Sequence, residues 1–430
     1  MPTVTADDSP SSGNMIIPIL STPARSVALT GLAALALANT LVAQTVLHPE
    51  PHLQSKFHDF RVVEVADGLI NPHSLAFTPD GDLLVTERPG RLRVIRDEVL
   101  LTDSVQGLPD IIALGRGARA MNGLEQAGLR DVRLHPEFEH NRLLYLSYVK
   151  PGPDSLGTLA VARGRYEDGR LYDLEEIFHA KASGNGSERS SMWGGRIALD
   201  KKGYIYVTLG DRQWPSSGDL WAHPAQSLTN HNGTTIRLHL DGRVPTDNPL
   251  VGRENALPEI WTWGHRNAQG IAIHPETGDV WSNEHGPQGG DEVNLLRSGS
   301  NYGWPVVGYG VNYRTGLAIH HGTQQDGMDD PAHVWVPSIG VSGMIFYTGD
   351  AFPEWKGDMF VGGMSGERLV RLRMDGQEVV SEEVILQDMG RIREVQQGID
   401  GLIYLAIDGG TRWEDGPPTQ IIRLEPAGMR

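Results

Sequence analysis

The chain contains no cysteine, which excludes disulfide bonds, thiolate zinc sites and cysteine nucleophiles together. Positive charge is also scarce. The chain has 37 Lys and Arg against 54 Asp and Glu, which gives a formal net charge of −17. A field of this sign repels phosphate backbones, so we expect no nucleic-acid partner. The same acidity suits a hard cation such as Ca²⁺, which takes carboxylate and carbonyl oxygens as ligands.

Long apolar runs are missing apart from one, SVALTGLAALALANTLVAQ, which follows Arg25. Its length and basic flank predict a secretory signal peptide and a periplasmic or secreted protein. The alternative is a membrane anchor, but Thr30, Asn39 and Thr40 interrupt the run, which falls short of a span of about 20 residues. We therefore expect no stable membrane insertion, an N-terminal extension over 1–44 and one domain over 45–430.

Glycine (52) and proline (27) are abundant, as many short strands joined by tight turns require. A short alternating apolar run, a Gly or Asn turn and a second β-rich run recur six times, each unit reading as a hairpin. The six units cover 75–87, 132–148, 196–211, 271–284, 344–363 and 395–408. This repeat predicts an all-β, six-bladed β-propeller; a β-sandwich or solenoid explains the variable insertions between units less simply.

Chemistry in a propeller belongs to the loops rather than to the strands. The segment 283–294, NEHGPQGGDEVN, combines acidic side chains with a Gly/Pro turn that can expose its carbonyls. It reads either as a calcium loop, with Asp291 and Glu292 among the ligands, or as a tight acidic turn.

Two arginine clusters stand out in this acidic chain. WGHRNAQG places Arg266 beside Asn267, and GRIREV places Arg391 and Arg393 on the same side of an expected strand. Forked hydrogen bonds from guanidinium groups suit a planar, carboxylate-bearing ligand. Ordinary surface ion pairs are the alternative for both clusters.

These motifs occur in one order over roughly residues 60–425: GLRDVRLHPEF, GGRIALD, NHNGTTIRLHLDG, WGHRNAQG, EHGPQGGDEVNLL, NYGWP and GRIREV. The pattern resembles the soluble aldose sugar dehydrogenases of the glucose/sorbosone dehydrogenase family, which use pyrroloquinoline quinone (PQQ). The resemblance implies a six-bladed propeller that oxidises the anomeric carbon of an aldose to a lactone and passes electrons to an acceptor that the sequence does not identify.

The resemblance also implies roles for particular residues. Gln126, Asp211 and Arg266 would serve the sugar and its oxidation. Calcium would lie on the Gly286 and Pro287 carbonyls, and a second, structural calcium on Glu292 and Tyr302. The quinone contacts implied are Arg266, Asn267, His285, Asp291, Ser338, Arg391 and Arg393.

One position departs from the family in a way that concerns the chemistry. The family places a histidine base directly before the glycines that open the third blade, and this chain has Met192 there. A thioether cannot accept a proton at neutral pH, and losing a general base lowers rate about 10²- to 10⁴-fold. The resemblance makes Asp211 the carboxylate that partners this histidine, and here Asp211 is retained.

Two smaller departures are Ser365, where some members have a lysine, and Val341, where a proline is common. The sequence thus predicts a calcium- and PQQ-dependent sugar dehydrogenase with weakened or rerouted catalysis. The alternatives are a degenerate propeller that binds carbohydrate or protein, and a calcium-dependent lactonase. A monomer or a dimer fits equally well.

Overall fold

The computed structural model describes residues 53–112, 127–151, 157–182, 184, 191–409 and 419–428. In these ranges the chain is built from strands, and its few helical turns are α1 (Phe138–Asn141), η2 (Leu220–Ala222), η3 (Pro224–Gln226) and η4 (Pro353–Trp355). Across the same ranges, no helix has the length and apolarity needed to cross a bilayer. The proposed signal peptide and the boundary at residue 44 lie outside the described residues.

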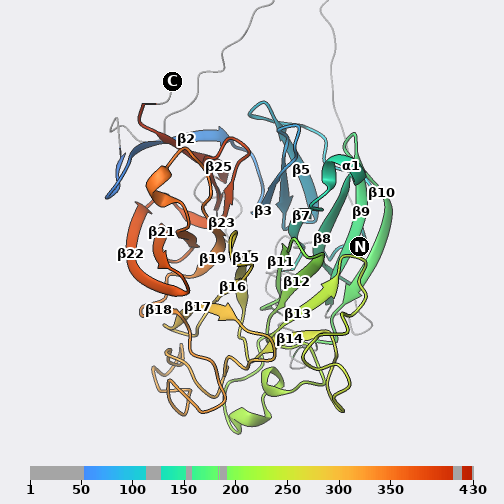
Figure 1. Cartoon of the computed structure of the whole chain (residues 1–430), viewed down its shortest axis with the longest axis vertical. Helices are drawn as coiled ribbons and strands as arrows, with labels where there is room; N and C mark the ends of the chain where they lie inside the picture. Colours follow the sequence, from blue (N-terminus) through green and yellow to red (C-terminus); the bar gives the residue numbers. More distant parts are fainter. Residues whose placement is uncertain are drawn as a thin grey trace, which may run out of the picture. The chain divides into compact units, whose positions relative to one another are not determined.

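Five four-stranded antiparallel sheets follow one another along the chain (Figure 1). The first is β3 (Pro72–Phe77), β4 (Leu83–Glu87), β5 (Arg91–Arg96) and β6 (Val99–Leu100). The second is β7 (Leu129–Leu134), β8 (Leu143–Lys150), β9 (Thr158–Glu167) and β10 (Arg170–His179). The third is β11 (Gly194–Leu199), β12 (Tyr204–Leu209), β13 (Thr234–His239) and β14 (Ile260–Trp263).

The fourth sheet is β15 (Ala268–Ile273), β16 (Val280–Glu284), β17 (Asp291–Leu296) and β18 (His333–Trp335). The fifth is β19 (Val341–Phe346), β20 (Met359–Gly363), β21 (Arg368–Asp375) and β22 (Glu378–Gln387). In every sheet the first two strands are one of the six predicted hairpins, so the repeat unit inferred from the sequence is confirmed.

The last sheet joins the two ends of the chain. It holds β23 (Arg391–Gln397), β24 (Ile403–Asp408) and β25 (Gln420–Pro426), and then β2 (Asp59–Ala66) and β1 (Leu53–Gln54). β2 pairs with β25 from Phe60↔Pro426 to Ala66↔Ile421. This closure was not foreseen from the sequence, and it removes the free edge that the last blade would otherwise expose.

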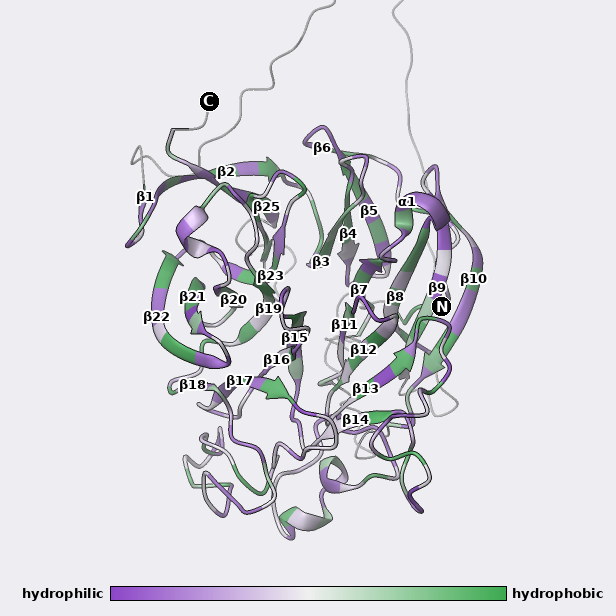
Figure 2. Ribbon diagram, viewed as in Figure 1, coloured by the Kyte–Doolittle hydropathy of each residue, from purple (hydrophilic) through white to green (hydrophobic). Residues whose placement is uncertain are grey.

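The first strand of each sheet contacts the first strand of the next, and β23 contacts β3, which closes the ring. The predicted six-bladed propeller is therefore confirmed. Apolar side chains of neighbouring sheets pack between the blades, for example Phe60, Phe360 and Leu405 in one cluster. In Figure 2 the hydrophobic colour concentrates on the strands, while the outer strands β10 and β22 mix both colours because one face meets solvent.

Charged side chains fill the middle of the ring. Arg196 on β11 forms a buried ion pair with Glu394 on β23, and its guanidinium also donates to the Gln269 and Arg393 carbonyls. On β7, Asp131 accepts from the Ile197 amide at 2.7 Å. The inner strands are thus tied together by polar contacts across the axis, and the loops at one end of these strands carry the candidate site.

Candidate active site

The predicted site residues come from loops that follow one another around one end of the ring. Arg266 and Asn267 lie between β14 and β15, and residues 285–290 lie between β16 and β17. Ser338 lies between β18 and β19, while Arg391 begins β23. Gln126 lies outside the described residues, so its predicted place near the sugar stays a prediction.

Asp291 joins two of these loops. One carboxylate oxygen accepts from the Gly286 amide at 3.0 Å, and the other accepts from the Gly340 and Val341 amides at 2.6 and 3.1 Å. The side chain is 1% exposed. Asp291 therefore anchors the turn that was read as a calcium loop, and its carboxylate is already occupied by three backbone donors.

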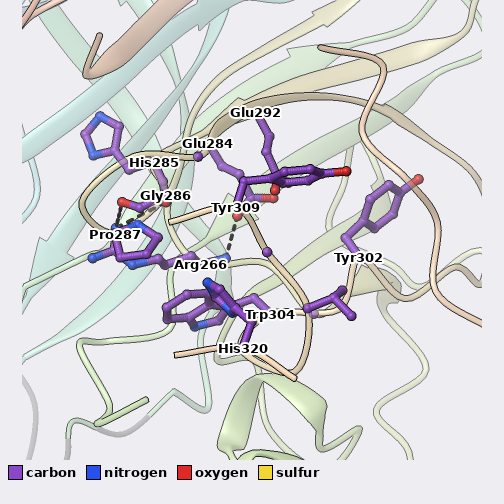
Figure 3. Close-up of a pocket in the computed structure, with 14 residues that line it drawn as sticks. Arg266, Glu284, His285, Gly286, Pro287, Glu292, Tyr302, Trp304, Tyr309 and His320 are labelled. Carbon is purple, nitrogen blue, oxygen red and sulfur yellow. Dashed lines mark hydrogen bonds between the residues drawn. The ribbon is translucent and has the colours of Figure 1, made fainter. Parts of the chain in front are cut away.

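Arg266 reaches the same turn from the neighbouring blade (Figure 3). Its Nη1 donates to the Gly286 carbonyl at 2.6 Å and to the His285 carbonyl at 3.1 Å. Its guanidinium carbon lies 5.2 Å from the centre of the Trp304 ring. The Arg266 amide donates to the buried Glu284 carboxylate, which fixes the main chain where the arginine starts.

Asn267 and His285 lie against each other, with Asn267 Nδ2 3.5 Å from His285 Nδ1. His285 Nε2 donates to the Val341 carbonyl at 2.7 Å, so the ring is held between two blades. Burial, opposed by the charge of Asp291, lowers the pKa of His285. The imidazole is therefore neutral near pH 7.

Arg391 and Arg393 do not form the matched pair that simple alternation predicts. A bulge interrupts β23 between Ile392 and Glu394. Arg393 is buried and donates Nε and Nη2 to Asp408 at 3.1 and 2.7 Å. Among the described residues, Arg391 Nη2 contacts the Met364 sulfur at 3.7 Å, and its buried Nε has no partner. Within the described ranges, no carboxylate lies in ion-pair distance of Arg391.

Glu292 and Tyr302 line one pocket together with Glu284, Arg266 and Trp304 (Figure 3). Burial, reinforced by the charge of Glu284, raises the pKa of Glu292 well above its usual range. The Tyr302 hydroxyl is already engaged by the Leu295 carbonyl and the Arg297 amide, so only its main chain could serve a cation. Across the described residues, no three His, Asp or Glu side chains converge as a ready metal cluster.

A long segment between β17 and β18 covers the 286–290 turn, which the sequence did not predict. Gln288 and Val311 exchange both backbone hydrogen bonds, at 3.1 and 3.0 Å. The Tyr313 hydroxyl donates to the Pro287 carbonyl at 2.9 Å. Gly310 is required here, because a Cβ would lie 2.4 Å from the Gly289 carbonyl oxygen.

Met192 and Asp211 lie side by side at the same end of the ring. The Met192 carbonyl accepts from the Arg212 amide at 3.3 Å, and the Asp211 amide donates to the Arg266 carbonyl at 2.8 Å. Met192 has a positive φ of 55°, which is unusual for a residue other than glycine. The position at which the resemblance implies a histidine base therefore lies next to the Asp211–Arg212 main chain, which in turn is hydrogen-bonded to the Arg266 carbonyl.

Asp211 is 1% exposed and accepts from the Gln213 amide and the Trp304 indole, both at 2.8 Å. Burial raises its pKa to about 6, against the opposing effect of Arg266. Trp304 was not singled out as a functional residue by sequence reasoning, although the NYGWP motif that contains it was noticed. Ser338 carries a buried hydroxyl without a partner.

Comparison with known proteins identifies the family to which this chain is similar. Residues 69–413 match the family model described as Glucose / Sorbosone dehydrogenase. The aldose sugar dehydrogenase of Escherichia coli is 37% identical over 349 residues, which cover 80% of this chain and 88% of that protein. Quinoprotein glucose dehydrogenase B of Acinetobacter calcoaceticus is 30% identical over 285 residues, covering 62% of this chain and 57% of that protein.

The fold agrees with these matches. The crystal structure of the soluble aldose sugar dehydrogenase from Escherichia coli, in its apo-form, superposes with a TM-score of 0.76 at 34% identity. The superposition covers 85% of this chain and 99% of that one. From the extent of the family match and the shared propeller, this chain belongs to the glucose/sorbosone dehydrogenase family.

Proposed function

We propose that this protein is a quinone-dependent aldose dehydrogenase that converts the anomeric carbon of a sugar to a lactone, with Asp211 as the proton acceptor. The observation that carries the proposal is the contact between Arg266 and the Gly286 carbonyl, at the end of the ring where Arg391 begins β23 and where the buried Asp211 carboxylate has a raised pKa.

The residues fit an anionic, planar quinone. Arg391 has a buried, unpartnered Nε and no carboxylate of its own in the described part of the chain, and the Ser338 hydroxyl is also buried without a partner. A carboxylate of PQQ would satisfy donors of this kind. Arg266 would supply a second positive group. Asn267 and His285 would contribute polar groups at the edge of the same surface.

The oxygen donors fit calcium, with Asp291 in a different role from the one expected. The Gly286 and Pro287 carbonyls each accept one hydrogen bond and keep a second lone pair for a cation. Asp291 would hold their turn in place rather than bind the ion. Glu292, whose buried carboxylate accepts only a 3.4 Å contact from Asn294, and the Tyr302 main chain would hold the second ion.

When bound, PQQ would supply a two-electron oxidant that accepts the hydride of the sugar C1–H bond, and calcium on the Gly286 and Pro287 carbonyls would supply a Lewis acid. The protein must then remove the proton of the C1 hydroxyl. Met192 cannot do so, whereas Asp211 is ionised above about pH 6 and lies beside it. Its accepting oxygens have spare lone pairs, so Asp211 would take the proton directly or through one water.

We further propose that residues 1–44 are an N-terminal extension with a cleaved signal peptide, that 45–430 form the single propeller domain and that the mature protein works in the periplasm or outside the cell. The apolar run behind Arg25 supports this proposal. Mass spectrometry of the exported protein should find a new N-terminus close to Gln44, and an intact N-terminus on an exported protein would contradict it.

The test of function is reconstitution of the purified chain with PQQ and calcium chloride, followed by dye reduction with glucose and other aldoses. We expect turnover that Asp211→Asn lowers by at least ~10²-fold, as loss of a general base does. Tight PQQ binding without any turnover would instead identify a degenerate, cofactor-binding propeller. No PQQ binding at all would contradict the proposal.

A further inference from the structure

Trp304 lies between Asp211 and Arg266. Its indole Nε1 donates to Asp211 Oδ2 at 2.8 Å, and the face of its ring lies 5.2 Å from the Arg266 guanidinium carbon. The side chain is 7% exposed. One aromatic ring therefore contacts both the candidate proton acceptor and the candidate quinone-binding arginine. Figure 3 shows the Trp304 ring beside Arg266.

The ring is fixed from several sides. The Trp304 main-chain amide donates to the Gly264 carbonyl at 2.8 Å, and the Trp304 main-chain carbonyl accepts from Gln226 Nε2 at 2.7 Å. Two imidazoles lie edge-on to it, His320 at 5.5 Å and His223 at 6.2 Å between ring centres. In this arrangement the indole N–H points at Asp211.

Neither imidazole can take over the hydrogen bond to Asp211. His223 Nδ1 accepts from the Ala225 amide, which leaves the proton on Nε2, 4.0 Å from Asp211 Oδ2 and too far for a hydrogen bond. His320 donates Nδ1 to the Pro305 carbonyl at 2.7 Å. Its Nε2 is then the unprotonated nitrogen and has no donor to offer.

In the part of the chain that the structure describes, few charged or titratable groups face Asp211. They are Arg266 ahead of β15, Glu284 at the end of β16 and His223 between η2 and η3. Arg266 favours the ionised carboxylate and Glu284 opposes it. Its direct donors among the described residues include the Gln213 amide and the Trp304 indole, and the indole belongs to a side chain that substitution can remove.

We infer that Trp304 is a positioning residue for sugar oxidation, an inference that rests on the proposed function. Its indole N–H holds the Asp211 carboxylate in place and favours its ionised form. The face of its ring holds Arg266 in position at the quinone site. The two roles use different parts of one side chain. Phenylalanine keeps a ring for Arg266 but has no N–H, and leucine lacks both, so the two substitutions separate the roles.

The first test needs neither quinone nor turnover. The infrared carbonyl band of protonated Asp211, identified by subtracting Asp211→Asn spectra, is followed against pH in the wild type and in Trp304→Phe. Loss of a hydrogen bond to a charged group should move the Asp211 midpoint upward by about one pH unit. Trp221→Phe, which removes an exposed tryptophan, should leave the midpoint where it is. An unmoved midpoint in Trp304→Phe would overturn the first role.

The second test measures binding of PQQ in the presence of calcium chloride. We expect Trp304→Phe to bind within about twofold of the wild type and Trp304→Leu to bind several-fold more weakly, as loss of a cation–π contact of about 1 kcal/mol requires. Equal affinities in all three proteins would overturn the second role. If the wild type itself fails to bind PQQ, the proposed function fails, while the infrared result still decides the link between Trp304 and Asp211.

In reconstituted enzyme the same variants should differ in pH profile. Trp304→Phe should keep KM and shift the acid limb of kcat upward with the Asp211 midpoint, which a purely structural defect would not do. A uniform fall in kcat at every pH, with no shift of the limb, would contradict the assignment.

Discussion

The carboxylate of Asp291 holds the amide of Gly286 at 3.0 Å, although the aspartate begins strand β17 and the glycine opens the turn before it. Its second oxygen holds two amides of the next blade. The turn that would present carbonyls to calcium is thus fixed to the neighbouring sheet by one buried side chain.

Asp291→Asn should therefore weaken binding of calcium and PQQ without removing any direct ligand. The amide group places an N–H₂ where a backbone N–H points, and hydrogen bonds to a charged acceptor contribute about 1.5–3 kcal/mol. We expect at least ~10-fold weaker binding in equilibrium titrations. The exposed Asp375→Asn is the matched control and should bind as the wild type does. Unchanged affinity in Asp291→Asn would refute the anchoring role.

Met192→His should raise turnover. Histidine is enriched among residues with positive φ, so it suits the φ of 55° at this position, and it restores a base beside Asp211. An increase of up to ~10²- to 10⁴-fold in kcat is expected from a positioned general base. Met192→Gln, which has similar length but no basic nitrogen, should give no increase. Equal rates for the two variants would show that the missing imidazole does not limit the reaction.

Asp211 should give the reaction an acid limit. The carboxylate accepts a proton only when ionised, and burial raises its pKa to about 6, so kcat should fall as pH drops through about 6. Asp211→Asn should lack this limb and most of the activity. A limb that persists in Asp211→Asn would assign the proton transfer to another group.

The raised pKa of Asp211 also predicts how the free energy of unfolding depends on pH. Between about pH 4 and pH 6 folded Asp211 keeps a proton that the unfolded chain has lost, so its contribution to stability is present at low pH and is lost as pH rises through about 6. Because the pKa of Asp211 is raised to about 6, this contribution to the free energy of unfolding is about 3 kcal/mol. In denaturant unfolding, the free energy of unfolding of the wild type should therefore fall between about pH 4 and about pH 7, and Asp211→Asn should lack this fall. Parallel pH dependence in both proteins would contradict a raised pKa.

The hairpins could be predicted because their signals are local. Each one carries its apolar alternation and its turn residue within a short stretch, and glycines such as Gly203 and Gly278 take positive φ there. At the second hairpin the expected turn residue Asn141 ends the one-turn helix α1, and Arg142 takes the left-handed conformation instead. Pairing of β2 with β25 left no such signal, since strands at opposite ends of the chain meet only once the ring closes.

The candidate site residues could be named from the sequence, whereas the contacts that they make in the structure could not. The resemblance implies a quinone contact for Asp291, and its acidic, glycine-rich loop suggested an oxygen ligand. In the structure its carboxylate accepts from three amides, two of which belong to another blade. Arg393 was paired with Arg391 by strand alternation, but a bulge and Asp408 separate their environments. Such contacts depend on how neighbouring blades pack, which no local pattern encodes.

The central ion pair of Arg196 and Glu394 should matter for folding rather than for binding. Both side chains are 1% exposed, so Glu394→Gln would leave a buried guanidinium without its main counter-charge and cost about 3–5 kcal/mol in urea unfolding. The exposed pair Arg243–Asp241 is the comparison, and Asp241→Asn should change stability by less than about 1 kcal/mol. Similar small effects for both would contradict a structural role for the central pair.

The most direct test of the proposed function is an equilibrium titration of PQQ into the calcium-loaded wild type. The same titration is made with Arg391→Met and with the wild type in the presence of a chelator. We predict saturable binding of one PQQ per chain that is lost when calcium is removed. The binding should weaken at least ~10-fold in Arg391→Met, because the buried Arg391 Nε has no partner in the described part of the chain and would donate to a PQQ carboxylate. Binding that is absent, or that is indifferent to Arg391 and to calcium, would contradict the proposed function.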